Sequence, residues 1–371
     1  MPAGTVRRDI ISRARRVVVK LGTSAISDDY GRLDLPLLRS LAGQICSAMD
    51  AGVAVTLVSS GAIGAGLAEL DLADRPRTLP MLQAVAAVGQ GQLMRTFHDT
   101  FARRGRKVAQ VLLTRGDFED RTRYLNIRNT LNTLSESGVV AVINENDAVA
   151  VDEIRYGDND LIAAHLTNML AGDLLVLLTN VDGVLAGGEV LDVVERVDEQ
   201  TLDLASGQRS RLGSGGMASK LQAVRIVTRA GEAAAIANSR TPRVLMRLLA
   251  GERLGTVFAP ARRKMSSRDR WIAQASRSAG RVVVDAGAAR ALRQRGKSLL
   301  PSGITAVKGR FEKGATVDVV DPAGRAVARG LSNYSAQQVE TIMGLKTSQI
   351  ARALGDKPYD EVIHRNNMTL L

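Results

Sequence analysis

Cysteine, histidine and aromatic residues are all scarce in this chain of 371 residues. The single cysteine, Cys46, cannot form an internal disulfide, and its apolar helical surroundings predict a buried thiol in a reducing cytoplasm. The three histidines, His98, His165 and His364, lack the spacing of metal ligands, which argues against a histidine metal site and against a Ser-His-Asp triad. Any chemistry must therefore use lysine, carboxylate, hydroxyl and backbone groups.

Long apolar runs are absent as well. No stretch of 18 uncharged apolar residues occurs, and residues 1–16 are rich in arginine without the apolar segment of a secretory signal. We therefore expect a protein that neither spans a membrane nor is exported by that route, with a frayed basic extension at its start. The 50 basic residues outnumber the 38 acidic ones, and this net charge of +12 is compatible with polyanionic ligands or simply with a basic surface.

Short runs rich in β-branched residues alternate with helical patterns over the first 250 residues. The runs are apolar at consecutive positions, as expected for strands covered by helices on both faces. They are Val17–Val19, Val53–Val58, Val108–Leu112, Val139–Ile143 and Leu174–Leu178. This pattern predicts an α/β protein, a three-layer α/β/α sandwich around a mainly parallel sheet.

The pattern changes between residues 261 and 281, where seven residues are basic and one is acidic. Beyond this segment, short strand-like runs are separated by glycine turns. These runs are Val282–Val284, Ile304–Val307 and Val317–Val320. We predict a catalytic domain over residues 1–262, a basic linker over 263–279 and a small β-rich barrel over 280–371.

The predicted strands of the first domain end in small, polar or charged residues. These strand ends and one following loop supply Lys20, Ser60, Asn144–Asp147, Asn159, Asp160, Thr179 and Asn180. In open parallel sheets ligands bind at the carboxyl ends of strands, so these residues are candidates for one site. Turn formation alone also favours Asn, Asp and Gly there. Lysine directly after a buried strand needs an anionic partner, and we expect one for Lys20.

A run of small residues from Gly213 to Lys220 precedes a further helical pattern. Glycines allow backbone N–H groups to approach an anion, a helix N-terminus favours negative charge, and the lysine adds a positive one. The run is not a Walker A loop, because Ser219 precedes Lys220 and Leu221 follows it. It is a candidate phosphate loop of another kind.

These candidates include no evident protein nucleophile and no general base. Transfer of a γ-phosphoryl group to a carboxylate needs neither, because the acceptor is already an anion. It needs alignment, and neutralisation of two anions that repel each other. Two lysines match that requirement. Magnesium would be carried mainly on the nucleotide phosphates, so we expect no dedicated metal site in the protein.

Six short motifs occur along nearly the whole first domain in the order found in amino-acid kinases. They are Val-Val-Lys-Leu-Gly-Thr-Ser (18–24), Ser-Ser-Gly-Ala-Ile (59–63), Leu-Leu-Thr-Arg (112–115), Ile-Asn-Glu-Asn-Asp-Ala-Val (143–149), Gly-Asp-Asn-Asp (157–160) and Gly-Gly-Met (215–217). The chain thus resembles the amino-acid kinase family, in particular its glutamate-phosphorylating members. The block Gly296–Ile304 resembles the PUA domain that bacterial members carry, which assigns residues 280–371 to such a domain.

The resemblance implies a role for each candidate. Lys20 and Lys220 would contact the transferred phosphoryl group, and Asp160 would orient both lysines. The glutamate ligands would be Ser60, Asp147 and Asn159. ATP would be held by Lys20, Thr179, Asn180, Ser214, Gly215, Gly216, Met217, Ala218, Ser219 and Lys220. The product would be L-glutamyl 5-phosphate, the first intermediate of proline synthesis. ATP and Mg²⁺ would be required, proline would be the feedback inhibitor, and the enzyme would be a dimer or tetramer.

Two features depart from the family pattern. Asn180 stands where aspartate is common, and the segment after Gly183 is short, which weakens the assignment of nucleotide contacts there. Ser214 and Ser219 replace frequent threonines but keep the hydroxyls. The alternatives are a sibling kinase acting on N-acetylglutamate and an RNA-binding protein acting through its PUA domain. Residues 276–371 hold 15 basic against 8 acidic residues but few aromatics for base stacking, which favours a structural or regulatory role over nucleic-acid binding.

Overall fold

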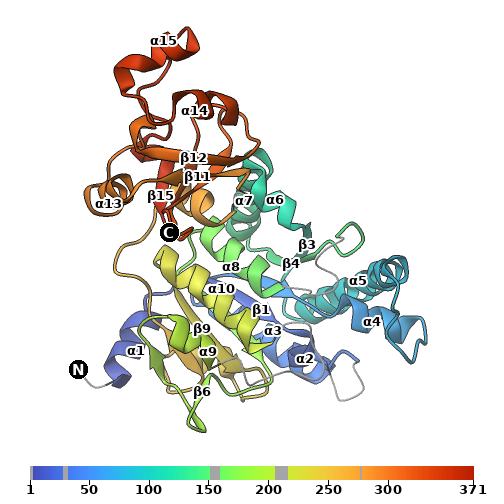
Figure 1. Cartoon of the computed structure of the whole chain (residues 1–371). Coiled ribbons are helices and arrows are strands. Elements are labelled where there is room, and N and C mark those ends of the chain that lie inside the picture. Colours follow the sequence, from blue (N-terminus) through green and yellow to red (C-terminus); the bar gives the residue numbers. More distant parts are fainter. Residues whose placement is uncertain (1–2, 28–31, 151–158, 205–215, 276–277) are drawn as a thin grey trace. The chain divides into compact units, whose positions relative to one another are not determined.

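The computed structural model describes residues 3–27, 32–150, 159–204, 216–275 and 278–371. The chain divides into two units (Figure 1). The first comprises Met1–Asp117 and Thr122–Lys264, and the second comprises Phe118–Arg121 and Met265–Leu371. No helix among the described residues is both long enough and apolar enough to cross a membrane.

The chain up to the end of the first unit contains helices and strands in alternation. In order they are α1 (Ala3–Ile11), β1 (Arg16–Leu21), α2 (Thr23–Ile26), α3 (Leu35–Asp50), β2 (Ala54–Ser59), α4 (Ala62–Glu69), α5 (Leu79–Ala102), β3 (Val108–Leu113), α6 (Arg115–Glu119), α7 (Arg121–Glu136), β4 (Val140–Glu145), α8 (Asn159–Met169), β5 (Leu174–Thr179), β6 (Leu185–Ala186), β7 (Glu189–Val190), β8 (Val193–Val194), α9 (Glu199–Asp203), α10 (Met217–Ala230), β9 (Ala233–Asn238), α11 (Val244–Leu249) and β10 (Thr256–Phe258).

Eight strands form the central sheet in the order β3-β4-β2-β1-β5-β9-β10-β8. The six strands from β3 to β9 are parallel to their neighbours, and β10 pairs antiparallel with β9. The chain leaves β1 for β2 on one side and returns to β5 on the other. This reversal of strand order beside β1 creates the type of crevice in which α/β proteins bind ligands.

Helices cover both faces of the sheet. Residues at odd positions of β1, such as Val17 and Val19, belong to a core that includes Leu41 of α3, Phe97 of α5 and Leu248 of α11. Helices α8 and α10 lie across the other face, to which the side chains at even-numbered positions of β1 point (Figure 1). The predicted three-layer sandwich around a mainly parallel sheet is therefore confirmed, as is the burial of Cys46.

The predicted strand runs are confirmed, and β9 is the longest of the central-sheet strands that were missed. Strand β9 has the sequence Ala-Ala-Ala-Ile-Ala-Asn, in which β-branched residues are nearly absent. Alanine has low β propensity, so nothing in this segment signals a strand. Its first five residues are buried, and the small side chains fit a strand that is packed between helices on both faces.

The second unit is β-rich, as predicted. Its regular elements are α12 (Ser267–Arg270), a turn of π-helix (Trp271–Ala275), β11 (Gly280–Val284), α13 (Ala286–Arg295), β12 (Ile304–Gly309), β13 (Thr316–Val320), β14 (Ala326–Leu331), α14 (Ala336–Ile342), α15 (Ile350–Leu354) and β15 (Met368–Leu370). The strands form one sheet in the order β12-β11-β13-β14-β15. Trp271 is anchored within this unit, since its indole N–H donates to the Phe118 carbonyl at 3.1 Å.

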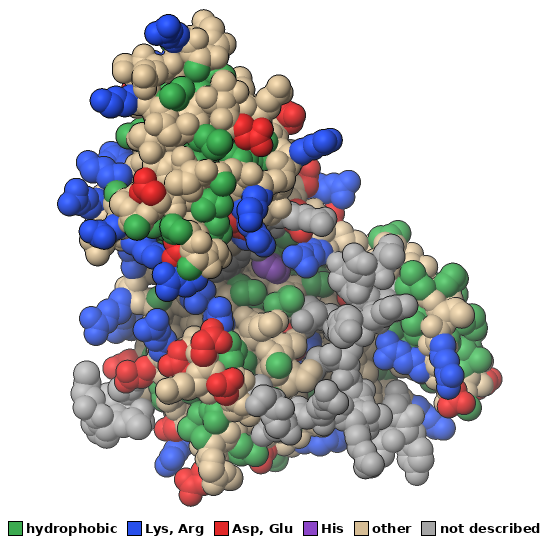
Figure 2. Space-filling model, in the orientation of Figure 1, with side chains coloured by type: hydrophobic (Ala, Val, Ile, Leu, Met, Phe, Trp, Pro, Cys, Tyr) green, Lys and Arg blue, Asp and Glu red, His purple; other side chains and the backbone are tan. Residues whose placement is uncertain are grey.

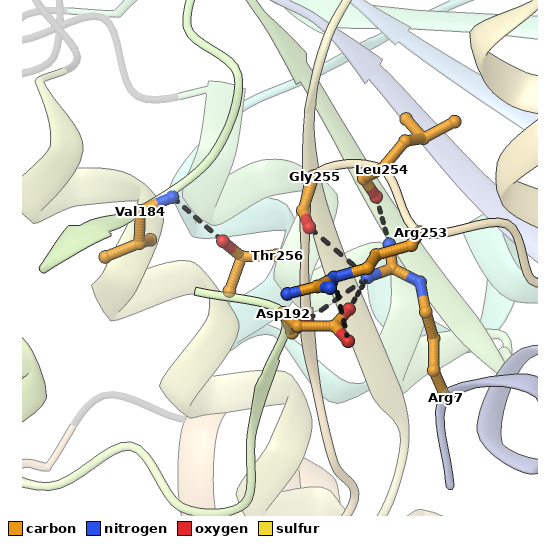
Figure 3. A network of polar contacts seen from close by, with 7 residues as sticks. All are labelled: Arg7, Val184, Asp192, Arg253, Leu254, Gly255 and Thr256. Atoms are coloured by element: carbon orange, nitrogen blue, oxygen red, sulfur yellow. Dashed lines mark hydrogen bonds and ion pairs between the residues drawn. The ribbon is translucent and has the colours of Figure 1, made fainter. Parts of the chain in front are cut away.

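A buried arginine ties the N-terminal helix to the far edge of the sheet (Figure 3). Arg7 of α1 is fully buried, and its guanidinium pairs with the Asp192 carboxylate and donates to the carbonyls of Leu254 and Gly255. The next residue, Thr256, accepts a hydrogen bond from Val184 N at 2.9 Å. This network holds together segments that lie far apart in the sequence. The expectation of a frayed basic extension at the start of the chain is therefore wrong for the segment around Arg7.

Substituting Arg7 should therefore destabilise the first unit. We expect Arg7→Met to lower the free energy of unfolding by about 1–3 kcal/mol, because buried carbonyl acceptors lose their donor. Arg253→Met is the matched control, since Arg253 also faces Asp192, at 3.5 Å, but its side chain is 82% exposed. Its effect should stay within about 0.5 kcal/mol. Urea unfolding measures both, and equal stability of the two variants would contradict this role.

Candidate active site

The carboxyl ends of β2, β1 and β5 meet at one edge of the sheet. Lys20 lies directly opposite Val58 of β2 and Leu177 of β5 in the parallel register. Because side chains alternate along a strand, Lys20 points to the face covered by α8 and α10. The sheet thus delivers its ammonium group to the first turns of those two helices.

One aspartate joins two lysines at this point. The Lys20 ammonium lies 2.5 Å from Asp160 Oδ1, and the Lys220 ammonium lies 3.1 Å from Asp160 Oδ2. Asp160 is the second residue of α8, and Lys220 lies in the first turn of α10. Ser219 donates its hydroxyl to Asp160 Oδ2 at 3.2 Å. The expectation that Lys20 needs an anionic partner is confirmed.

The three charged side chains are buried, which makes their pairing energetically important. The side chain of Asp160 is 1% exposed, and those of Lys20 and Lys220 are 7% and 8% exposed. Burial alone would raise the pKa of Asp160, but the charges and hydrogen bonds of Lys20 and Lys220 outweigh it and lower the pKa to about 2. Asp160 is therefore ionised at neutral pH and fixes where both ammonium groups lie.

The N-terminus of α10 completes this part of the site. Gly216 is its N-cap residue, and no side chain caps the helix. The first-turn N–H groups of a helix have no partner within the helix and carry partial positive charge, which favours a phosphate at that position. Gly216, Met217, Ala218, Ser219 and Lys220 are placed here, whereas Ser214 and Gly215 lie outside the described residues.

An amide network lies beside the lysines. Asn159 of α8 donates through Nδ2 to Ser60 Oγ and to Asn144 Oδ1, both at 3.0 Å. Asn144 in turn donates to Gln90 Oε1 at 2.7 Å. The Asn159 Oδ1 atom is buried and accepts no hydrogen bond from any described residue. The network therefore presents a fixed acceptor that suits a donor on a bound molecule.

The sequence interpretation missed Gln90, because in the sequence this residue lies in the middle of a helical segment and does not follow a strand. It reaches the site because α4 and α5 pack very closely. A Cβ atom at Gly89 would lie 1.9 Å from the Ala62 carbonyl oxygen, and one at Gly66 would lie 1.9 Å from the Val85 carbonyl oxygen. Only glycine permits this approach. The glycines in these two consecutive helices were the signal in the sequence that the helices approach each other closely.

The remaining candidates lie at neighbouring strand ends without contacting the lysine cluster. Thr179 is buried at the end of β5, and its hydroxyl lies 3.3 Å from Asn180 Oδ1. Asp147 follows β4 and makes no hydrogen bond or ion pair with any described residue. Burial raises the pKa of Asp147 to about 6, although the nearby Arg75 opposes the shift. Asp147 is thus a carboxylate that titrates near neutral pH.

No group of three or more His, Cys, Asp or Glu side chains among the described residues could hold a metal ion. Asp160, the carboxylate at the centre of the cluster, is occupied by two ammonium groups. The donor set of the described residues therefore does not fit a metal bound directly by side chains. It does fit anionic oxygens, which lysines and an uncapped helix N-terminus both attract.

A parallel α/β/α sandwich with two buried lysines and an open helix N-terminus at its strand ends defines a phosphotransferase-type site for anionic substrates. The family model for the amino acid kinase family matches residues 15–238, and that for the PUA domain matches residues 280–354. The chain belongs to the amino acid kinase family and carries a C-terminal PUA domain.

Relatives with known names are similar over their full length. Glutamate 5-kinase of Caldanaerobacter subterraneus subsp. tengcongensis is 46% identical over 96% of this chain and 98% of its own. Glutamate 5-kinase of Geobacter sp. strain M21 is 45% identical over 99% of this chain and 100% of its own. Among solved structures, carbamate kinase from Giardia lamblia bound to AMP-PNP is 19% identical, covers 67% of this chain and 100% of its own, and has a TM-score of 0.49.

Proposed function

We propose that this enzyme is a glutamate 5-kinase, which transfers the γ-phosphoryl group of ATP to the side-chain carboxylate of L-glutamate. The product is L-glutamyl 5-phosphate, the first intermediate of proline biosynthesis. The observation that carries the proposal is the buried Lys20–Asp160–Lys220 cluster at the carboxyl edge of the sheet. Full-length similarity to glutamate 5-kinases supports the same substrate.

The cluster fits the electrostatic demand of this reaction. A carboxylate oxygen of glutamate attacks the γ-phosphorus, the bond to the β–γ bridging oxygen breaks, and ADP leaves with the bonding electrons. Both reactants are anions, so the reaction requires positive charge at the transferred group. A lysine about 4 Å from a phosphate oxygen contributes on the order of 4 kcal/mol at an effective dielectric of about 20. Asp160 keeps Lys20 and Lys220 in place without a reorganisation during transfer.

The amide network is our candidate for the glutamate site. Ser60, Asp147 and Asn159 would bind glutamate, with Asn144 and Gln90 fixing the orientation of Asn159. An ammonium group has three donors and no acceptor. The unpartnered Oδ1 of Asn159 and the carboxylate of Asp147 both suit such a group. These acceptors favour free glutamate over N-acetylglutamate, whose amide nitrogen carries no charge.

ATP would be bound by Lys20, by Thr179 and Asn180, and by the loop from Ser214 to Lys220. The uncapped N-terminus of α10 would receive its phosphates. Mg²⁺ would be carried on those phosphates, where it neutralises charge on the nucleotide. Asn180 provides an amide where aspartate is common, so it would contact the nucleotide as a neutral group.

Trapping with hydroxylamine tests the activity. With ATP, magnesium and L-glutamate, the enzyme should yield a hydroxamate from the acyl phosphate, and N-acetylglutamate or aspartate should yield far less. A hydroxamate formed from N-acetylglutamate but not from glutamate would overturn the substrate assignment. No hydroxamate from any acidic amino acid would overturn the kinase assignment.

The pH dependence of glutamate binding should follow Asp147. Because its pKa is raised to about 6, the carboxylate is increasingly protonated below that pH and loses its charge for the substrate ammonium group. We expect KM for glutamate to rise towards tenfold per pH unit below about pH 6. Asp147→Asn should show a high KM without this dependence, while KM for ATP changes little in either protein. A pH profile unchanged by the substitution would contradict the assignment.

We further propose the domain limits 1–262 for the kinase domain, 263–279 for the linker and 280–371 for the PUA domain, with a structural or regulatory role for the last. Its aromatic residues are poorly placed for base stacking, since Phe311 and Tyr334 are buried and Lys313 lies 4.6 Å from the centre of the Tyr359 ring. Salt-sensitive RNA binding that disappears on deleting residues 276–371 would favour the alternative function.

The remaining proposals concern regulation and assembly. We expect proline, the end product of the pathway, to inhibit the enzyme, and the protein to work in the cytoplasm as a homodimer or homotetramer. Inhibition is measured in the hydroxamate assay by adding proline at fixed glutamate. A mass measurement in solution gives the number of subunits, and a monomer would contradict the assembly.

A further inference from the structure

A cavity lined mainly by charged residues lies in the first unit, away from the lysine cluster. It has a volume of about 430 Å³, within the usual range for small-molecule sites. Four arginines line it: Arg196, Arg225, Arg229 and Arg262. Figure 2 shows Lys and Arg side chains gathered over the end of α10, next to acidic side chains over α9.

The topology places this cavity at the opposite edge of the sheet from the active site. Its lining includes Ala259 and Pro260, which directly follow β10. Strand β10 runs antiparallel to β9, so its last residue, Phe258, pairs with Ala234 near the start of β9. Along α10, Arg229 lies nine residues after Lys220, which corresponds to about 14 Å of helix. Binding there is therefore separate from phosphoryl transfer.

Positive charge exceeds negative charge in the lining, which holds four arginines and the three carboxylates of Glu195, Asp198 and Glu199. Arg225 pairs with Glu199 at 3.1 Å. By contrast, Arg196, Arg229 and Arg262 form no ion pair with any described residue. The other acidic residues of the lining are Glu195 and Asp198, and Asp198 accepts hydrogen bonds from Thr201 at the start of α9. The lining thus carries one more positive charge than negative charges, and three of its guanidinium groups form no ion pair with a described residue.

The arginines also lie close enough to repel one another. Partial burial, followed by the charges of Arg225 and Arg196, lowers the pKa of Arg229. Arg225 and Arg229 are four residues apart on α10, where like charges destabilise a helix. The partial negative charge at the C-terminus of α10 offsets part of this repulsion. An anion bound in the cavity would offset the remaining repulsion between the arginines. A planar guanidinium group can bind two phosphate oxygens at once.

We propose that this cavity binds a small phosphate-bearing molecule through Arg196, Arg229 and Arg262. A phosphate group carries between one and two negative charges near neutral pH and has several acceptor oxygens. Its oxygens can therefore accept hydrogen bonds from more guanidinium groups at once than a single carboxylate can. Because the cavity lies apart from the catalytic lysines, the ligand is an effector or a structural ligand of the enzyme rather than its substrate.

Calorimetric titration with pyrophosphate tests the proposal, and a parallel titration with citrate tests whether a carboxylate ligand binds instead. Arg196→Gln/Arg229→Gln should weaken pyrophosphate binding at this site at least tenfold and leave glutamate-dependent turnover within twofold of the wild type. Both arginines are accessible to solvent and neither forms an ion pair with a described residue, so the variant should fold. Arg262→Gln provides a milder second test. Arg103→Gln, an exposed arginine at the end of α5, is the matched control and should bind as the wild type does.

Lys220→Ala separates this site from the active site, where pyrophosphate can also bind. The cavity site should persist in Lys220→Ala and disappear in the double arginine variant. Binding that is lost in Lys220→Ala but retained in the arginine variant would overturn the proposal. So would a preference for citrate, or the absence of any binding to Lys220→Ala at concentrations up to about 10 mM.

Discussion

Replacing Lys220 or Lys20 by methionine should lower glutamate-dependent turnover at least about a hundredfold, because removal of one preorganised electrostatic group typically costs that much or more. Each lysine lies within hydrogen-bonding distance of Asp160 and is nearly buried. Methionine keeps the length and apolar volume of the side chain, and the remaining lysine still neutralises Asp160. The fold should therefore survive while the charge at the transferred phosphoryl group is lost.

Steady-state kinetics with both substrates measures this effect, and circular dichroism checks the fold. Lys107→Met is the matched control, because Lys107 is exposed and has no ion-pair partner among the described residues. Its turnover should equal that of the wild type. If either active-site variant keeps more than about a tenth of wild-type turnover, the lysine it lacks does not stabilise the transition state.

Replacing Asp160 by alanine should be the most destabilising single change in the site. It removes the shared counter-ion of two buried lysines, and breaking a buried ion pair in this way typically costs about 3–5 kcal/mol. Asp160→Asn should cost less, because the amide keeps one hydrogen-bond acceptor. Asp99→Ala is the control, since the Asp99 side chain is 63% exposed. Chemical denaturation measures all three, and an Asp160→Ala protein as stable as the control would contradict the cluster's role.

The same carboxylate predicts a pH dependence of stability. The pKa of Asp160 in the folded protein is lowered from 3.8 to about 2. Because the folded-state pKa is depressed, this contribution is fully present above about pH 4 and is lost as the pH falls toward 2. The stability difference between the wild type and Asp160→Asn should therefore shrink over that interval. A difference that stays constant down to pH 2 would contradict the shift.

Much of the fold could be predicted from the sequence, because buried parallel strands leave a strong pattern. Consecutive apolar residues, mostly Val, Leu and Ile, marked β1, β2, β4 and β5, whereas the alanine-rich β9 carried no such mark. Lys20 could be recognised because a charge at the end of a buried strand needs a partner. That the partner is Asp160 could not follow from spacing, since 140 residues separate them and only the packing of α8 on β1 joins them.

The polar network was the harder part of the site to predict. Asn159 and Ser60 were singled out as separate ligands, and their mutual hydrogen bond depends on how α8 meets the turn after β2. Gln90 reaches Asn144 only because glycines let α4 and α5 approach closely. Such long-range contacts arise from helix packing, which a single sequence does not specify residue by residue.

The central claim is that the glutamate side-chain carboxylate itself attacks the γ-phosphorus of ATP. Glutamate labelled with ¹⁸O in that carboxylate tests it directly when the product is trapped with hydroxylamine. Hydroxylamine attacks the acyl carbon, so the phosphate leaves with the bridging oxygen that came from glutamate. ³¹P NMR should then show inorganic phosphate with one ¹⁸O atom, formed in equal amount to the hydroxamate. Unlabelled phosphate would show that water attacks ATP instead and would contradict the account.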